Sequence, residues 1–188
     1  ISHMVDIYTN PDLYDSIHHS YEWDKTLIKA IAKDINGPVL ELASGTGRLT
    51  QTILELGLEY KGLELSQSFL ERAKMKFGGK ADFILGDMRD FDLEMEFDLI
   101  FIGFNSFLHN LTIDDAKNCL TCIKKHLTKN GKFLVSIFVP DPIFLYREEG
   151  KLFPATDFFQ YQESNCRIME KNQYDSISQI NQLTWVIE

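Results

Sequence analysis

Short apolar runs alternate along most of this chain with segments whose apolar residues recur at helical spacing. The runs 97–104 and 133–139 are almost wholly apolar, which is typical of strands that are covered on both faces, as in a parallel sheet. The predicted strands are 39–43, 60–65, 81–85, 97–103 and 132–139, and the predicted helices are 11–34, 46–57, 67–77 and 112–128. This order predicts an α/β fold with a doubly wound, mostly parallel sheet and helices on both faces.

Residues that favour helix ends mark the limits of several of these elements. Asn10 followed by Pro11 predicts a helix start, and Ser66 and Thr112 are predicted N-caps. The segment 88–96 lacks a helical pattern and is predicted to be a loop with a short turn. Helix ends are predicted at three glycines, Gly57, Gly78 and Gly131.

After Pro140 and Pro142 the pattern changes to an alternation of polar and apolar residues, which is clearest around Cys166 and Ile168. A period of two predicts two or three antiparallel strands between residues 157 and 188 rather than further strand–helix units.

The composition limits the classes of function that fit this chain. Its 188 residues, 44% hydrophobic and 25% charged, are typical of a soluble globular domain. The net charge of −9 and the pI near 5.0 argue against a broad nucleic-acid surface. No apolar run approaches the roughly 20 residues of a membrane span, and no signal-peptide pattern is present. Residues 1–4 resemble a cloning scar, so His3 is left out of every candidate site.

The three cysteines do not predict a disulfide framework or a metal site. Cys119 and Cys122 form a Cys-x-x-Cys inside the predicted helix 112–128, and Cys166 stands apart. Because no second pair of cysteines or histidines accompanies them, buried thiols on a helix face are favoured over a zinc or redox role. Such cysteine usage suits a reducing compartment, so the predicted location is cytoplasmic.

The strongest chemical signal is the segment 39–48, where an apolar strand with Glu41 passes into a turn with Gly45 and Gly47. Glycine accepts a positive φ and lets the backbone approach a ligand. A strand, turn and helix of this kind hold nucleoside-containing cofactors at the carboxyl end of a parallel sheet. Two further acidic strand ends follow, at Glu64 and Asp87.

With these three acidic strand ends, the chain resembles the class I S-adenosylmethionine-dependent methyltransferases, above all small bacterial members that methylate small molecules at nitrogen. The resemblance covers residues 11–139. It implies the strand order 3-2-1-4-5, S-adenosylmethionine as cofactor and S-adenosylhomocysteine as product. Relatives add two more sheet strands after their antiparallel segment, whereas this sequence stops within the alternating run 183–188. We therefore expect an incomplete domain, without the final two sheet strands and with 132–139 either at an edge or paired with a segment foreign to this plan.

The resemblance also assigns roles to the motif residues. Glu41 is implied to organise the amino group of the cofactor, Glu64 to accept from both ribose hydroxyls, and Asp87 to accept from the adenine amine. Many relatives have glycine where Ala43 stands, and a methyl group should be tolerated there. The implied cofactor contacts are Tyr14, Tyr21, Trp23, Glu41, Ala43, Ser44, Gly45, Gly47, Glu64, Leu65, Asp87, Met88, Phe104 and Asn105, with Leu65 and Met88 beside the adenine and Phe104 and Asn105 at the methyl-donor end.

The acceptor pocket is implied to come from the N-terminal helix and the late antiparallel insertion. Methyl transfer is an in-line displacement at a sulfonium that is already charged, so an amine acceptor needs no obligatory base. Tyr14 and His109 are the candidate catalytic residues, because their surroundings resemble the N-terminal helix and the post-strand loop of relatives. His18 and His19 are expected at the surface, since adjacent helical positions point in different directions.

The prediction is therefore an enzyme that moves a methyl group to a small-molecule acceptor, at an amine nitrogen, with neither nucleic acid nor membrane as partner. The predicted organisation is a cofactor-binding core at 5–139 with an N-terminal helical cap, and a substrate-covering antiparallel insertion at 140–188. An RNA or protein methyltransferase and a cofactor-binding protein without catalysis stay open as alternatives. An NAD-binding Rossmann domain is disfavoured, because its fingerprint needs a third glycine where Thr50 stands. The sequence does not fix the oligomeric state.

Overall fold

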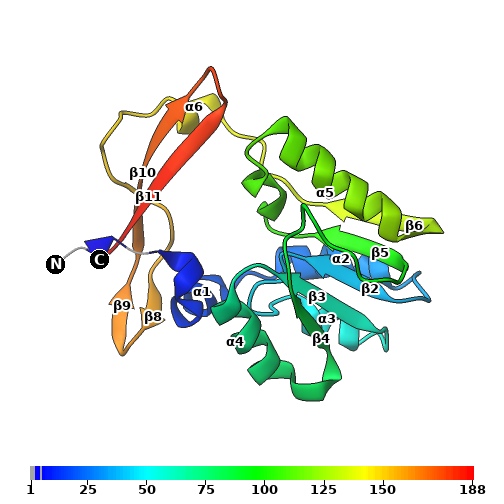
Figure 1. Ribbon diagram of the computed structural model, residues 1–188. Coiled ribbons are helices and arrows are strands. Elements are labelled where there is room, and N and C mark those ends of the chain that lie inside the picture. The colour runs from blue at the N-terminus through cyan, green and yellow to red at the C-terminus, as the bar shows by residue number, and fades with distance from the viewer. Residues whose placement is uncertain (1–2, 5) are drawn as a thin grey trace. The chain divides into compact units, whose positions relative to one another are not determined.

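The computed structural model describes residues 3–4 and 6–188, which fall into two compact units (Figure 1). Tyr21–Ile137 forms one of them, which we call the α/β unit. The other, which we call the antiparallel unit, combines the described part of Ile1–Ser20 with Phe138–Glu188. Of the expected cloning scar, residues 1–2 lie outside the described residues.

The α/β unit is built on a five-stranded sheet in the order β4-β3-β2-β5-β6. Each neighbouring pair is parallel, and the register places Glu41 opposite Gly62. The strands are β2 (Val39–Leu42), β3 (Tyr60–Glu64), β4 (Asp82–Leu85), β5 (Phe97–Ile102) and β6 (Leu127–Val135). Numbered within this sheet, the order is 3-2-1-4-5, so the predicted fold class and strand order are confirmed, with β6 at an edge.

Helices cover both faces of this sheet. One face carries α2 (Trp23–Ala32), α3 (Thr50–Leu54) and α4 (Gln67–Phe77), which share an apolar core with the sheet. The other face carries α5 (Ile113–His126), whose Cys119 and Ile123 pack with apolar residues of β2 and β5. The short 3-10 helices η2 (Gly78–Lys80) and η3 (Ser106–His109) lie in the connections. This is the three-layer arrangement that the apolar runs predict.

The predicted caps of α4 and α5 are confirmed. The Ser66 side chain accepts a hydrogen bond from the backbone N–H of Phe69 at 3.4 Å, and that of Thr112 accepts from Asp115 at 3.0 Å. Gly78 ends α4 with a φ of 56°. Such a left-handed backbone is costly for other residues, which is why glycine ends the helix there.

The antiparallel unit contains a four-stranded sheet in the order β1-β11-β10-β7 and a hairpin of β8 and β9. These strands are β1 (His3–Met4), β7 (Phe153–Pro154), β8 (Phe159–Tyr161), β9 (Ser164–Cys166), β10 (Ile168–Asp175) and β11 (Ile180–Ile187). Its helices are η1 (Ile7–Thr9), α1 (Pro11–His18) and α6 (Pro142–Leu145). The predicted antiparallel arrangement is confirmed, but the range 157–188 holds four strands, β8 to β11, instead of two or three. Within the described residues the segment 140–188 adds no strand to the five-stranded sheet.

A buried ion pair stabilises α6 against the antiparallel sheet. Glu170 on β10 is 6% exposed, and its two carboxylate oxygens accept from Arg147 at 2.7 Å and from the indole of Trp185 at 2.6 Å. The Arg147 guanidinium also lies over the rings of Phe144 and Phe153. Both charges are therefore paired and hydrogen-bonded, as a buried ion pair requires.

Three predicted element boundaries are wrong. The predicted helix 11–34 is divided between α1 and α2, because residues 19–22 form a turn and a short non-helical segment. The predicted helix 46–57 shortens to α3, since tight turns occupy 45–49. The predicted strand 132–139 begins earlier and ends at Val135, and Gly131 lies inside β6 instead of ending a helix. An irregularity in the pairing with β5, between Phe97 and Leu99, accommodates this early start.

His18 is not at the surface, contrary to the sequence prediction. It is 6% exposed, its Nδ1 lies 2.8 Å from the carbonyl oxygen of Tyr14, and its ring is 4.2 Å from the Tyr14 ring. Spacing of four residues places the two side chains on the same face of α1, which adjacency to His19 does not indicate. His19 is exposed, as predicted.

Among the described residues, no helix is both long enough and apolar enough to cross a membrane.

Candidate functional site

The loops that follow β2, β3, β4 and β5 lie at one edge of the sheet, because these strands are parallel (Figure 1). Glu41 lies in β2, Glu64 is the last residue of β3, and Asp87 follows β4 by two residues. The predicted acidic residues thus share the carboxyl edge of the α/β unit, beside the turn that contains Gly45 and Gly47.

The turn after β2 has a left-handed backbone at three positions. The φ angles are 55° at Ala43, 60° at Gly45 and 79° at Gly47. A Cβ at Gly47 would lie 2.7 Å from Cε2 of Phe77, so a side chain does not fit there. Ala43 and Gly45 are partly exposed, so a ligand can reach the backbone at these two positions.

Glu64 links this turn to the loop after β3. It is 8% exposed, and its two carboxylate oxygens accept hydrogen bonds of 2.8 Å from the backbone N–H groups of Gly45 and Ser66. Each oxygen of a carboxylate can accept two hydrogen bonds. Glu64 can therefore hold the turn and still accept from two donors of a ligand.

Glu41 lies deeper, with 3% of its surface exposed, and accepts a 2.6 Å hydrogen bond from the hydroxyl of Tyr60. Burial raises the pKa of Glu41 to about 8; the Tyr60 hydrogen bond and Arg48 oppose this shift, and the carboxylates of Asp24 and Glu64 add to it. Its carboxyl group is consequently mostly protonated at neutral pH.

Two hydroxyl groups, those of Ser44 and Thr50, lie next to Glu41 and Tyr60. Ser44 Oγ and Thr50 Oγ1 are buried and have no hydrogen-bond partner among the described residues. Burial and the adjacent Glu41 raise the pKa of Tyr60, and these two hydroxyls act in the opposite direction. The turn therefore encloses a small group of polar side chains rather than an apolar core.

Arg48, the residue after Gly47, joins several aromatic residues that were predicted separately. Its guanidinium makes a bidentate ion pair with Asp24, donates to the Tyr21 carbonyl at 3.1 Å, and lies 5.3 Å from the centre of the Phe104 ring. The Tyr21 ring contacts Phe104 edge-on at 4.9 Å and Trp23 at 5.6 Å. The structure thus brings Tyr21, Trp23 and Phe104 together at the start of α2 and the end of β5.

Sequence reasoning missed Arg48, Asp24 and Tyr60. Arg48 could have been noticed, because it directly follows the glycine turn. Nothing in the spacing indicates that Asp24 on α2, or Tyr60 at the start of β3, meets the residues of that turn.

Asp87 makes a different contact from the one implied for adenine. Arg89 donates to both of its oxygens, from Nε at 2.9 Å and from Nη2 at 2.6 Å, and the Arg89 backbone N–H donates at 2.9 Å. The Arg89 hydrogen bonds hold the pKa of Asp87 below its usual value. Arg89 also contacts Asp115 at 3.5 Å. The adenine contact of Asp87 stays a prediction.

The chain after β5 turns sharply into η3. Phe104 and Asn105 have φ angles of 50° and 66°, a strained backbone that recurs at functional sites. His109 ends η3 and is exposed at its surface; the surrounding protein lowers its pKa, and the negative charge of Glu64 acts in the opposite direction.

Leu65 and Met88 lie at the ends of β3 and β4, where the resemblance implies an adenine. Leu65 is 66% exposed, which is unusual beside a buried carboxylate. Met88 is partly buried, with its sulfur 3.9 Å from Nδ2 of Asn110. Tyr14 belongs to α1 in the antiparallel unit, so its implied place at the cofactor stays a prediction.

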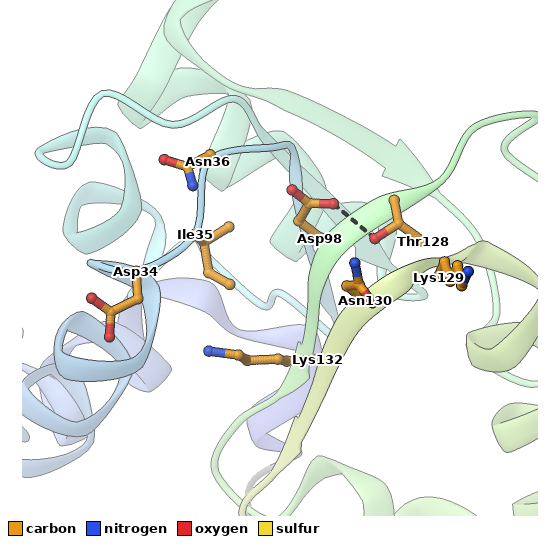
Figure 2. A pocket seen from close by; sticks show the side chains of 8 residues that line it. All are labelled: Asp34, Ile35, Asn36, Asp98, Thr128, Lys129, Asn130 and Lys132. Carbon is orange, nitrogen blue, oxygen red and sulfur yellow. Dashed lines mark hydrogen bonds between the residues drawn. The ribbon is translucent and has the colours of Figure 1, made fainter.

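A cavity of about 400 Å³ lies at the opposite edge of the sheet (Figure 2). It is lined by the segment 34–36 before β2, by Asp98 near the start of β5 and by residues 128–132 of β6. Asp98 accepts a hydrogen bond of 2.8 Å from Thr128 there. The polar lining comes from the amino-terminal ends of the strands, so this cavity is separate from the candidate site.

Comparisons with known proteins agree with this geometry. Residues 39–131 match the family model described as a methyltransferase domain. An uncharacterized methyltransferase of Anoxybacillus flavithermus is 29% identical over 148 residues, which are 78% of this chain and 65% of that relative. DesVI of Streptomyces venezuelae has a similar structure, with a TM-score of 0.73 at 19% identity over 99% of this chain and 84% of its own. SAM-bound CalS10 of Micromonospora echinaspora, an amino pentose methyltransferase, gives 0.74 at 17% identity over 97% and 75%.

The sheet order and the helices on both faces define a Rossmann-like α/β unit. The comparisons support a class I S-adenosylmethionine-dependent methyltransferase, with S-adenosylmethionine as cofactor. The polar groups of the site suit this cofactor. Glu64 has acceptor capacity for a pair of hydroxyls, Glu41 offers a carboxyl for an amine, and exposed Leu65 offers an apolar face for a base.

Proposed function

We propose that this chain transfers a methyl group from S-adenosylmethionine to an amine nitrogen of a small molecule. The observation that carries the proposal is the contact of Glu64 with Gly45, which joins the glycine turn to a carboxylate that can still accept two hydrogen bonds. The likeness to CalS10, an amino pentose methyltransferase, supports an amino sugar as the class of acceptor. The net charge of −9 favours such an acceptor over RNA.

The residues of the carboxyl edge would hold and orient the cofactor. Glu64 would accept from the two ribose hydroxyls, Glu41 would pair with the amino group, and the backbone at Ala43 and Gly45 would contact the methionyl part. Leu65, with Met88 beyond it, would exclude water from the base. S-adenosylmethionine, when bound, supplies a methyl group that its sulfonium already activates, so alignment and exclusion of water are the main tasks of the protein.

The acceptor amine must present a lone pair and lose one proton during the transfer. His109 can take that proton, because its lowered pKa leaves the imidazole neutral at pH 7. Because a neutral amine needs little help from a base, loss of His109 should reduce the rate less than loss of a cofactor contact.

The test is methylation of a panel of amino sugars and simple amines with isotopically labelled S-adenosylmethionine, followed by mass spectrometry. We expect one class of amine to gain label with the natural sequence and much less with Glu64→Ala. A chain that binds S-adenosylhomocysteine but labels no amine would contradict the proposed acceptor. A chain that binds NADH and not S-adenosylhomocysteine would contradict the proposed cofactor site.

A further inference from the structure

Glu41 occupies a position of β2 that the strand pattern assigns to the core. Side chains alternate along a strand, so Glu41 shares its face with Val39, which is fully buried against α2 and α3. Gly62, opposite Glu41, has no room for a side chain, because a Cβ there would lie 2.7 Å from Ser44 Oγ and 2.9 Å from a ring carbon of Phe83. The carboxyl group is thus closely surrounded on the side of β3, and Glu41 is only 3% exposed.

The charged groups around Glu41 do not neutralise it. Arg48 is the nearby cation, but its guanidinium forms a bidentate ion pair with Asp24. The other facing groups are the carboxylate of Glu64 and the phenol of Tyr60. Among the described residues that act on Glu41, Arg48 is the cation, and Asp24 and Glu64 are carboxylates. The Glu41 carboxyl accepts a hydrogen bond of 2.6 Å from a neutral donor, the Tyr60 hydroxyl.

We propose that Glu41 holds a proton in the free protein and releases it when the amino group of the cofactor binds, and that Tyr60 positions the resulting carboxylate. The inference rests on the proposed function, because it takes Glu41 to face that amine. The carboxyl O–H bond breaks, its electron pair stays on the oxygen, and the proton passes to the buffer. Tyr60 then donates its hydrogen bond to a carboxylate that pairs with the ammonium group.

The physical reason is the cost of an unpaired buried charge. An ionised Glu41 in the free protein would be a buried anion without a cation of its own, which burial disfavours. An ammonium group placed beside it supplies that cation, and the ionised form becomes the favoured one. Binding and deprotonation are then linked, so cofactor affinity rises with pH below the titration of the free carboxyl.

Calorimetry with S-adenosylhomocysteine tests the linkage without turnover, since this ligand carries the same amino group but no sulfonium. Titrations in two buffers of different ionisation heat, at about pH 6.5, should report release of close to one proton per ligand bound. Affinity should increase roughly tenfold between about pH 6 and pH 7. In Glu41→Gln both the proton release and the pH dependence should disappear.

Tyr60→Phe tests the positioning role. Loss of the hydroxyl removes the hydrogen bond that opposes the raised pKa of Glu41, so the rise in affinity should move to higher pH. Tyr174→Phe, which removes a hydroxyl from the antiparallel unit, is the matched control and should leave the rise in place. His109 is another titratable group; burial lowers its pKa, and the negative charge of Glu64 acts in the opposite direction. His109→Gln should therefore keep the proton release if Glu41 is its source.

The outcomes separate this inference from the proposed function. Ligand binding without proton release, or proton release that persists in Glu41→Gln, overturns the inference and leaves the cofactor site standing. An unshifted pH profile in Tyr60→Phe overturns the role of Tyr60. Release with S-adenosylmethionine but not with S-adenosylhomocysteine overturns the pairing of Glu41 with the amine. Absence of binding by either ligand overturns the proposed cofactor site instead.

Discussion

Replacement of Glu41 by glutamine should change how the stability of the ligand-free protein depends on pH. The pKa of this carboxyl is 4.5 as a reference value and about 8 in the folded protein. The folded state therefore binds more protons than the unfolded state within this window, so the contribution of Glu41 to stability is complete below the lower value and is lost as pH rises to the upper one. Glutamine does not titrate, and the Glu41→Gln variant should lack this loss.

The size of the effect follows from the window. Each pH unit between the two pKa values costs about 1.4 kcal/mol, and the cost levels off near the upper value. Between pH 6 and pH 8 the natural sequence should thus lose about 2 kcal/mol more than Glu41→Gln. A difference of this size is well above the error of a denaturation measurement.

Hydrogen exchange is the suitable assay, because it follows β2 and β3 rather than both units at once. In the natural sequence, peptides from these strands should exchange faster in urea at pH 8 than at pH 6, after correction for the intrinsic exchange rates. In Glu41→Gln this difference between the two pH values should be absent. Glu55→Gln, which removes an exposed carboxylate at the end of α3, is the matched control and should follow the natural sequence. Parallel pH profiles for the natural sequence and Glu41→Gln would refute the reasoning, because the carboxyl would then be ionised when folded.

Three further predictions concern other contacts. Glu64→Ala should weaken binding of S-adenosylhomocysteine at least about tenfold, measured by calorimetry, because each unpaired buried donor costs roughly 1–3 kcal/mol; an unchanged affinity would remove Glu64 from the site. Ala43→Gly should stabilise the protein by about 0.5–1 kcal/mol in urea denaturation, because relief of a left-handed alanine exceeds the entropy that glycine adds to the unfolded chain; destabilisation would contradict this. Arg147→Met should destabilise the antiparallel unit by about 3–5 kcal/mol, since it leaves Glu170 as a buried charge, and the double variant with Glu170→Gln should recover part of the loss; equal losses in both variants would argue against the ion pair.

The sheet could be predicted from the sequence because its signals are local. Apolar runs define strands, and the glycines of the turn show where one strand ends and a ligand-facing backbone begins. The limits of the helices were less predictable where a turn and a short non-helical segment, residues 19–22, divide a continuous apolar pattern. The early start of β6 depends on its pairing with β5, which the sequence of β6 alone does not encode.

The polar contacts of the site were predictable only in part, for a related reason. Glu64 follows its strand directly, and the parallel sheet alone brings it to the glycine turn. The partner of Arg48 is Asp24, 24 residues earlier in the chain, and only the packing of α2 brings them together. The pairing of Asp87 with Arg89 is local, yet a ligand-binding role and a surface ion pair use the same residue types. Spacing can therefore identify which acidic residues gather at the edge, but not what each carboxylate contacts.

Glu41 is a more informative case, because its conflict with the surrounding pattern was already visible in the sequence. An isolated carboxyl inside an apolar strand is unfavourable unless it is neutral or paired. The structure contains the neutral solution, a buried hydroxyl donor from Tyr60, and no cation committed to Glu41 among the charged groups that face it. A protonated Glu41 needs no buried cation, so the site is stable without a ligand. When a ligand with an ammonium group binds, the deprotonated Glu41 forms an ion pair with it. A polar residue at a core position is expected at functional sites. Glu41 is such a residue, and its position indicates that the positive charge of a ligand should bind next to the Glu41 carboxyl.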